Sequence, residues 1–372
     1  MLNHKLLLYL NTNKLISSSQ HGFLHKHSTC SNLLESADDW TSCLDRGIDT
    51  LILYVDFAKA FDSVSVPKLI LKLKSIGITG NFLKIVSSLL NNRSQKVKVG
   101  NILSRSRPVV SGVPQGSVLG PILFLLFIND LSSSLPSDSI SKLFADDVKS
   151  YIQINTDMSH IVFSNLINAI ELWSNKWQLP LAVSKCTWML LSNRIEINRP
   201  SYSFIMAGLE LDGTDEIKDL GVIFNSKLGF DGHIDNMVAR AKQRLFLLKK
   251  SFVSKDSSVL IFAFKTYILP LLDYCSPVWS PFLITDVLRI ESIQRSFTKS
   301  LAICPKNTSY KDRLAICELT SLEHRRLLTD LILFYKIINN LVSIDLNDTI
   351  IPYPPLLKPE VTPAASRSHR PN

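Results

Sequence analysis

Apolar runs that lead to acids mark two places in the first half of the chain. Residues 51–55 are an unbroken apolar run followed by Asp56, which predicts a buried strand with a carboxylate at its C-terminal end. Residues 142–151 place Asp146 and Asp147 between two apolar stretches. This pattern predicts a strand, a tight turn and a second strand, because the short Asp side chain tolerates turn dihedral angles.

Helical spacing of apolar residues predicts helices over much of the remaining chain. The spacing is visible at 67–91 and 160–178 and continues from residue 258 onward, whereas 96–99 alternates like a half-exposed strand. The most apolar run, 118–128, is shorter than the about 20 residues that cross a bilayer. It therefore predicts a buried core helix.

Composition limits the class of protein. A chain of 372 residues with 46% hydrophobic residues can bury a sizeable core, which excludes a disordered protein, and its net charge of +9 suits a polyanion partner. The six cysteines form no CxxC pair and no zinc spacing with histidine, so free thiols in a reducing compartment are expected. Asparagines interrupt the first apolar stretch, so no signal peptide is predicted. We therefore expect an intracellular protein, nuclear or cytoplasmic, without a membrane partner.

Asp56, Asp146 and Asp147 are the candidate metal ligands. Adjacent carboxylates at a hairpin tip repel each other and reduce stability unless a cation joins them. If the two strand ends meet, the acids form a cluster of hard oxygen ligands of the kind that suits Mg²⁺. Two such ions stabilise the attacking and leaving oxygens of a phosphoryl displacement. The alternative is two unrelated strands with solvated or capping acids.

Three motifs in order resemble the palm motifs of a reverse transcriptase. They are Asp56-x-x-x-Ala60-Phe61-Asp62, the loop Ser-Gly-Val-Pro-Gln-Gly-Ser at 111–117, and Phe144-Ala145-Asp146-Asp147. Their form resembles the jockey-like branch of the non-LTR (LINE-type) retrotransposons. In that family an endonuclease domain and early fingers strands precede this point, so the chain resembles an N-terminally truncated copy.

The resemblance implies a right-hand polymerase of the α+β class, with an antiparallel palm sheet backed by helices. The expected divisions are partial fingers at 1–50, the palm at 51–225, a helical thumb and post-thumb region at 226–350, and a disordered tail at 351–372.

The same resemblance implies roles for individual residues. Asp56 and Asp146, assisted by Asp147, would bind two Mg²⁺ ions, or Mn²⁺, and Lys185 matches by position a lysine that protonates the departing pyrophosphate. Phe61 would clash with a ribose 2′-hydroxyl, although core packing also explains it, and Lys185 is also interpretable as a solvated lysine. The family often has Arg where Leu24 stands, so Lys26 is the best substitute for holding the triphosphate. The complete predicted substrate set is Phe57, Phe61, Gln115, Gly116 and Lys26.

Nucleic-acid contacts are expected after residue 218. The segment 219–224 resembles the primer grip, where a tight turn at Gly221 would hold the primer 3′ end. A basic amphipathic helix at 233–252 falls where the family's thumb begins. Its cations would contact duplex phosphates in a salt-dependent way, and the candidates are Arg240, Lys242 and Arg244.

The sequence thus predicts an RNA-directed DNA polymerase that acts in retrotransposition. Its partners would be an RNA template, a DNA primer and deoxynucleoside triphosphates. A catalytically inactive nucleic-acid-binding remnant is the main alternative: the missing early fingers favour it, and the intact Asp56, Gln115, Asp146 and Asp147 oppose it. A metal-dependent nuclease needs only the acids and leaves the 111–117 loop unexplained.

Overall fold

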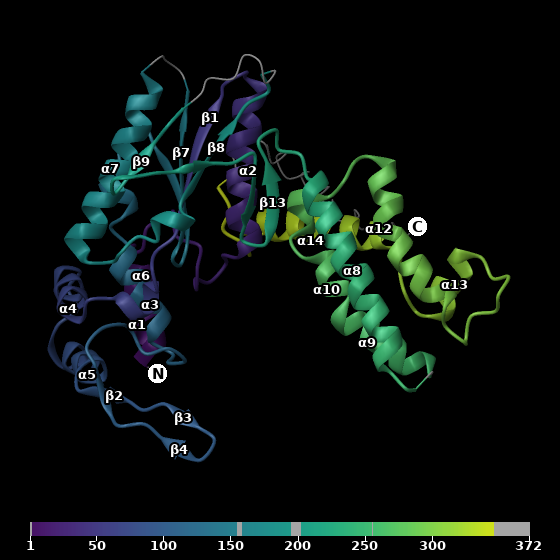
Figure 1. Ribbon diagram of the computed structural model, residues 1–372, viewed down its shortest axis with the longest axis horizontal. Helices are drawn as coiled ribbons and strands as arrows, with labels where there is room; N and C mark the ends of the chain where they lie inside the picture. The colour runs from purple at the N-terminus through teal and green to yellow at the C-terminus, as the bar shows by residue number, and fades with distance from the viewer. Residues whose placement is uncertain (1, 155–157, 195–201, 255, 346–372) are drawn as a thin grey trace, which may run out of the picture.

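A five-stranded sheet lies at the centre of the first 225 residues (Figure 1). The structure is a computed structural model that describes residues 2–154, 158–194, 202–254 and 256–345, so the tail predicted at 351–372 lies outside the described residues. The strand order is β11–β8–β1–β7–β6, and all neighbours are antiparallel except β11 and β8. The strands are β1 (Thr50–Val55), β6 (Ile140–Phe144), β7 (Asp147–Gln153), β8 (Thr187–Leu191) and β11 (Asp212–Gly213).

Helices of the N-terminal part pack on both faces of this sheet, which confirms the predicted α+β class. The helices expected at 67–91, 118–128 and 160–178 are all present. The α-helices are α1 (Leu2–Thr12), α2 (Thr29–Asp45), α3 (Ala60–Ser63), α4 (Val66–Ser75), α5 (Gly80–Leu90), α6 (Gly120–Ile128) and α7 (Ser159–Trp177). Two short 3-10 helices are η1 (Ser132–Ser134) and η2 (Val183–Lys185).

Strand β1 is buried on both faces, as its unbroken apolar run predicts. Because side chains alternate along a strand, Leu51 and Leu53 enter one core, which includes α6 and α7. Ile52 points the other way, into a second core with Trp40 of α2 and the C-terminal helices. Asp56 comes four residues after Ile52, and alternate residues of a strand share a face. Asp56 therefore lies on the side of the sheet that carries the second core.

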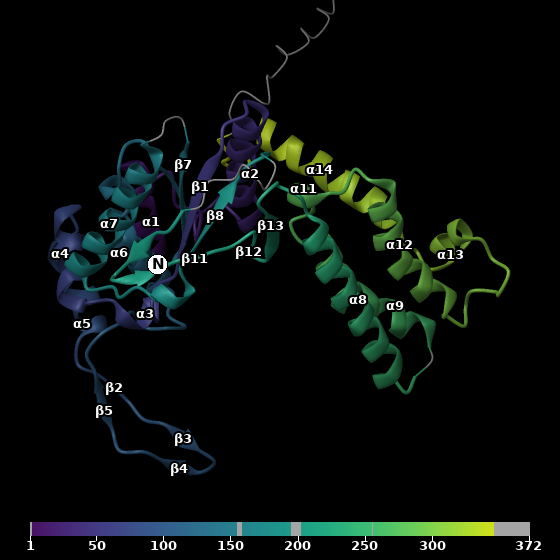
Figure 2. The same ribbon diagram turned by 45° about the horizontal axis from the view of Figure 1, so that its top comes forward.

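Short strands form two smaller hairpins and one long ribbon. The ribbon pairs β2 (Arg93–Gln95) with β5 (Arg107–Val109) and β3 (Lys98–Val99) with β4 (Ile102–Leu103), and it projects away from the helices (Figures 1 and 2). Val97 and Val99 are 63% and 74% exposed. The strand predicted at 96–99 is present at Lys98–Val99, but its expected half-exposure was wrong, because both faces of this part of the ribbon are exposed. The hairpins are β9 (Ile205–Met206) with β10 (Leu209–Glu210), and β12 (Glu216–Asp219) with β13 (Val222–Asn225).

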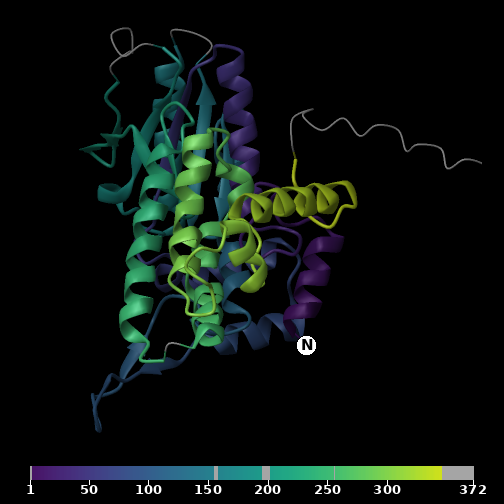
Figure 3. The same ribbon diagram turned by 90° about the vertical axis from the view of Figure 1, so that its right-hand side faces the viewer.

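The C-terminal part is helical, as its apolar spacing predicts. Phe264 of α9 stacks on Phe297 of α12 with the ring centroids 4.1 Å apart, inside the second core. Figure 3 shows α14 lying across the other helices. None of the helices in the described ranges is both long and apolar enough to span a membrane. The helices are α8 (Asp231–Ser251), α9 (Ser257–Tyr267), α10 (Leu269–Asp273), α11 (Ser276–Trp279), α12 (Ile284–Lys299), α13 (Tyr310–Ile316) and α14 (Leu322–Ile338).

Candidate active site

The two strand ends that carry acids meet at one end of the sheet. In the antiparallel pair β1–β7, Val55 lies opposite Val148, so Asp56 after β1 comes next to Asp147 at the start of β7. Asp146 occupies the turn between β6 and β7, directly after Ala145, whose φ is +59°. The predicted strand–turn–strand is thus confirmed, and the fold brings the three acids together.

Burial and neighbouring charges disfavour the ionised forms of Asp146 and Asp147. Burial first, and then the charges of Asp146, Asp219 and Asp56, raise the pKa of Asp147 to about 6. Burial raises the pKa of Asp146 as well, with a further contribution from Asp56. A bound cation would relieve this repulsion and favour the ionised carboxylates.

The donor chemistry of the three acids fits a divalent cation. Carboxylate oxygens are the ligands that Mg²⁺ prefers, and the register of β1 and β7 brings Asp56 next to Asp147. Within the ranges that the structure describes, however, no three His, Cys, Asp or Glu side chains already stand as a closed metal-binding group. The carboxylates would have to turn inward to share an ion.

Lys185 lies beside the first acid. Its Nζ is 3.5 Å from Asp56 Oδ2, and the Lys185 side chain is 67% exposed. The residue belongs to η2 immediately before β8, and β8 pairs with β1, so the sheet fixes its proximity to Asp56. The fold therefore brings Lys185 close to the acids, and its predicted role as a proton donor stays a prediction.

The turn that carries Asp146 is supported from the N-terminal loop. Gln20 Oε1 accepts hydrogen bonds from the backbone N–H groups of Ala145, at 2.9 Å, and of Gly22, at 2.7 Å. A Cβ on Gly22 would lie only 2.4 Å from the Ala145 nitrogen. Only glycine allows the loop to approach the turn this closely.

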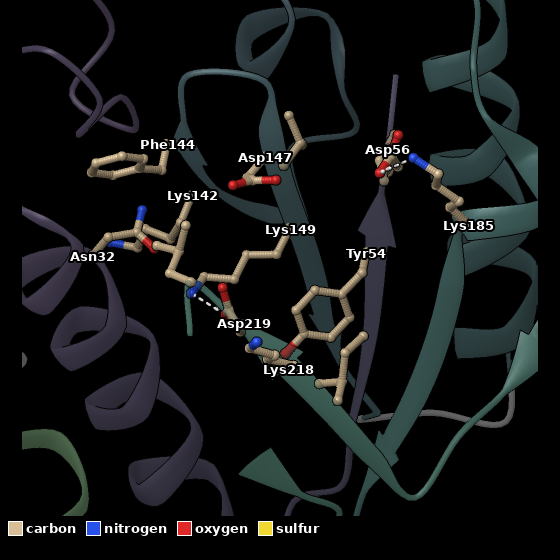
Figure 4. A pocket seen from close by; sticks show the side chains of 14 residues that line it. Asn32, Tyr54, Asp56, Lys142, Phe144, Asp147, Lys149, Lys185, Lys218 and Asp219 are labelled. Atoms are coloured by element: carbon tan, nitrogen blue, oxygen red, sulfur yellow. Dashed lines mark hydrogen bonds and ion pairs between the residues drawn. The ribbon is translucent and has the colours of Figure 1, made fainter. Parts of the chain in front are cut away.

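A cavity of about 150 Å³ opens beside the acids (Figure 4). Below Asp56 and Asp147, Lys149 of β7 forms an ion pair with Asp219 of β12, with Nζ and Oδ2 2.6 Å apart. Both side chains are almost fully buried, at 3% and 7% exposure. The pair connects the strand that carries Asp147 to the hairpin that contains Gly221.

The turn of that second hairpin is held from the other side by the helical region. Leu220 and Gly221 have φ values of +44° and +95°, which confirms the tight turn predicted here. Tyr274 Oη donates a 2.7 Å hydrogen bond to the Leu220 carbonyl, and a Cβ on Gly221 would lie 3.1 Å from the Tyr274 ring. Lys149 and Tyr274 were not predicted. The available signal for Lys149 was a lysine within the apolar run of β7.

The 111–117 loop lies against the residues that follow Asp56. Gln115 Nε2 donates to Asp62 Oδ1 at 2.9 Å, so Asp62 supports the loop. Gly116 has a φ of +74°, and a Cβ added there would meet no atom within 4 Å, so its surface is open to a ligand. Phe61 stacks on Phe124 of α6 at 4.3 Å, which serves core packing and fixes its ring beside this loop.

Two members of the predicted substrate set lie elsewhere. The Phe57 side chain is only 4% exposed and packs edge-on against Trp173 of α7 at 5.9 Å. Substrate binding at Phe57 therefore stays a prediction that the burial of its side chain does not support, because the chain past Asp56 turns Phe57 into the core. Lys26 Nζ donates to the Asn340 carbonyl at 2.5 Å instead of facing the acids. Its proposed contact with a triphosphate stays a prediction that this geometry does not support.

The three predicted nucleic-acid residues of α8 lie on two faces of the helix. Arg240 and Arg244, four residues apart, line a groove of about 340 Å³ together with Gly221 and Tyr274. Arg244 also donates to the Tyr267 carbonyl at 2.8 Å. Lys242 is exposed but does not line the groove, since it lies half a helical turn away.

Known proteins with similar sequences are reverse transcriptases. The family model described as reverse transcriptase (RNA-dependent DNA polymerase) matches residues 1–224, more than half of the chain. The RNA-directed DNA polymerase from mobile element jockey of Drosophila funebris is 25% identical over 318 residues, which cover 81% of this chain and 34% of that protein. Its counterpart from Drosophila melanogaster is 27% identical over 241 residues, covering 63% of this chain and 26% of that protein.

The similarity extends to a further element and to solved structures. The probable RNA-directed DNA polymerase from transposon X-element of Drosophila melanogaster is 25% identical, over 77% of this chain and 32% of that protein. A structure of telomerase from Candida tropicalis with a fragment of telomeric RNA covers 92% of this chain and 54% of that chain, with 13% identity and a TM-score of 0.45. The chain spans about a third of the length of the curated relatives that it matches. The family match, together with the order of the three motifs and the α+β right-hand polymerase fold, shows that this chain belongs to the reverse transcriptase family, with relatives among the jockey-like non-LTR retrotransposons.

Proposed function

We propose that this chain is an RNA-directed DNA polymerase, which adds deoxynucleotides to a primer 3′-hydroxyl and acts in retrotransposition. The observation that carries the proposal is the convergence of Asp56, Asp146 and Asp147 at one end of the sheet. Divalent ions bound there, Mg²⁺ or Mn²⁺, would activate the attacking hydroxyl and neutralise the triphosphate. RNA template, DNA primer and deoxynucleoside triphosphates are the corresponding partners.

The acids and Lys185 divide the chemistry between them. Asp56 and Asp146 would be the principal ligands of two ions, with Asp147 assisting. Lys185, 3.5 Å from Asp56, would give its proton to the departing pyrophosphate. General acid assistance of this kind typically contributes on the order of 10²–10⁴-fold to a rate.

Residues beside the acids would orient the incoming nucleotide. Gln115 and Gly116 lie on a loop that Asp62 supports, and the backbone at Gly116 is open to a ligand. The Phe61 ring, fixed by its stack on Phe124, would meet a ribose 2′-hydroxyl and so favour deoxynucleotides. Gly221 at its tight turn would hold the primer end, with Arg240 and Arg244 on duplex phosphates.

In this interpretation the chain has the divisions of a right-hand polymerase. Residues 1–50 correspond to part of the fingers, 51–225 to the palm, and 226–350 to the thumb and the region after it. The five-stranded sheet in the second division and the helices of the third support the assignment. Copying an RNA element places the activity inside the cell, in the nucleus or the cytoplasm.

Primer extension on an RNA template tests this function. The chain, a labelled DNA primer annealed to RNA, deoxynucleotides and Mg²⁺ are compared with the same mixture containing Asp146→Asn. Asp138→Asn, which changes an exposed acid just before β6, is the matched control. Extension is expected with wild type and Asp138→Asn and lost with Asp146→Asn.

The alternative of a nucleic-acid-binding remnant predicts a different pattern. The chain would bind primer–template in a salt-dependent way with no extension in any variant, and Asp146→Asn would leave binding unchanged. Lys26, whose ammonium is engaged by Asn340, favours this alternative, since it removes one candidate for the triphosphate. The intact acids and the Gln115 loop favour the polymerase.

A further inference from the structure

Positive charge is concentrated in one stretch of the chain. Between Asp62 and Asp130 the sequence holds nine Lys or Arg residues and no Asp or Glu. The net charge of this stretch is therefore +9, which equals the formal net charge of the whole 372-residue chain. Five of the nine cations lie on the projecting two-stranded ribbon, residues 93–109, which we call the basic ribbon: Arg93, Lys96, Lys98, Arg105 and Arg107.

The outer part of the basic ribbon is rich in exposed cations. Lys98 pairs with Leu103 and the Ser104 N–H bonds to the Val97 carbonyl, whereas Gln95 pairs with Arg107. Lys96 and Arg105 therefore lie where the two ladders of the ribbon are out of step by one residue. Lys96, Lys98 and Arg105 are all exposed.

These three cations lie near one another without an acidic partner. In the described ranges, no acidic side chain forms an ion pair with Lys96, Lys98 or Arg105. The ribbon also carries Val97, Val99 and Ile102, which are 63%, 74% and 77% exposed. The outer part of the ribbon therefore contributes nothing to the core, and Lys96, Lys98 and Arg105 are available to a ligand.

The base of the ribbon is attached to the candidate active site. The Arg93 guanidinium donates to the carbonyl oxygens of Ser111, at 2.8 Å, and Gly112, at 2.5 Å. These are the first residues of the loop that carries Gln115. A Cβ on Gly112 would lie 2.7 Å from the Cα of Asp62, so the loop is also pressed against the residues after Asp56. The ribbon is thus fixed at its base to the loop that carries Gln115.

The ribbon and the basic helix α8 lie on opposite flanks of the sheet and project toward the same side (Figures 1 and 2). Helix α8 is joined through β13 to the tight turn at Gly221, where a primer end is proposed to lie. The ribbon is joined to the 111–117 loop, which carries Gln115. The two basic elements are thus attached to different parts of the candidate site.

We propose that the basic ribbon binds the phosphate backbone of single-stranded nucleic acid, namely the unpaired part of the template before it reaches Gln115. Residues 93–109 contain no aromatic side chain, so stacking on bases is not available and the contact is independent of sequence. Binding by the ribbon does not require catalysis, whereas naming the bound strand as template rests on the proposed function.

Fluorescence anisotropy of labelled RNA tests this proposal. A 25-nucleotide single strand and a blunt duplex are titrated with the full chain, without deoxynucleotides, at 50–200 mM salt. The test variant is the triple change Lys96→Gln, Lys98→Gln and Arg105→Gln. The charge-matched control changes three exposed lysines outside the ribbon: Lys5→Gln, Lys74→Gln and Lys84→Gln.

The salt dependence gives the expected size of the effect. Each phosphate contact on a single strand contributes about 0.7 to the slope of log affinity against log salt. Losing three contacts lowers the slope by about 2, so between 50 and 200 mM wild type should lose about 20-fold more single-strand affinity than the ribbon variant. Blunt-duplex binding should change little, and the control should behave like wild type.

Two results would overturn the proposal. An equal loss of affinity in both triple variants would mean that only net charge matters. An equal effect of the ribbon variant on duplex and single strand would assign the ribbon to duplex instead. Primer extension is measured separately, so a chain that binds through the ribbon but extends no primer keeps this proposal and contradicts the proposed function.

Discussion

Breaking the Lys149–Asp219 pair from one side should be among the most damaging changes to the fold. The two side chains are 3% and 7% exposed, and their charged atoms are 2.6 Å apart, so each charge depends on the other for the interactions that water would provide. Lys149→Met leaves the Asp219 carboxylate buried without its partner. Removing one partner of a buried pair typically costs about 3–5 kcal/mol of stability.

The same reasoning gives the opposite result for the double variant. Lys149→Met combined with Asp219→Leu leaves no buried charge, and replacing a buried pair with apolar residues is often neutral or stabilising. Loss of stability in the double variant should therefore be within about 1 kcal/mol, well below that of the single change. This recovery distinguishes an ion pair in a dry interior from two independent packing contacts.

Urea unfolding followed by circular dichroism measures these free energies. The exposed pair Arg289–Asp235, with side chains 43% and 55% exposed, provides the matched control. Arg289→Met should change the free energy of unfolding by only about 0–1 kcal/mol, because solvent screens that pair. If Lys149→Met also costs less than about 1 kcal/mol, the pair is hydrated and the reasoning is refuted.

Three further predictions concern the site and its support. Gly22→Ala should reduce the free energy of unfolding by about 1–3 kcal/mol in urea titrations, because the new Cβ would lie 2.4 Å from the Ala145 nitrogen; an unchanged midpoint would contradict the close packing of that turn. Burial alone would raise the pKa of Glu35, but hydrogen bonds from His21 and Lys142 lower it to about 2 from its ordinary 4.5. Ionised Glu35 therefore contributes about 3 kcal/mol of stability above about pH 4.5, which is lost as pH falls towards 2, and Glu35→Gln should flatten the stability–pH curve in that window. Phe61→Val should increase ribonucleotide incorporation relative to deoxynucleotide by roughly 10-fold in single-nucleotide extension, and an unchanged ratio would assign Phe61 to packing on Phe124 alone.

The sequence predicted the acids well because each stands at the end of a strongly apolar strand. A carboxylate after residues 51–55 and two more at a hairpin turn need only correct strand pairing to meet, and the β1–β7 register provides it. The buried helix α6 was predictable from its own apolar run, whereas the tight turn at Gly221 was expected from the resemblance to the primer grip.

Features that depend on packing between distant segments were not predictable. Lys149 and Asp219 are 70 residues apart, and neither sequence neighbourhood indicates that they form a buried ion pair. Phe57 follows Asp56 directly, but a bridge to Leu181 and contact with Trp173 turn its side chain into the core. Lys26 lies in a loop near the start of the chain, and the distant Asn340 carbonyl engages its ammonium, which no local pattern indicates.

Single-nucleotide incorporation tests the central claim most directly. The chain is mixed with a DNA primer annealed to RNA, one complementary deoxynucleotide and Mg²⁺, and primer lengthening is followed in wild type, Asp56→Asn and Asp138→Asn. The account predicts a primer one nucleotide longer in wild type and Asp138→Asn and none in Asp56→Asn, with primer–template binding retained in all three. Equal incorporation by Asp56→Asn and wild type would contradict the claim that the acids at the end of the sheet are the catalytic centre.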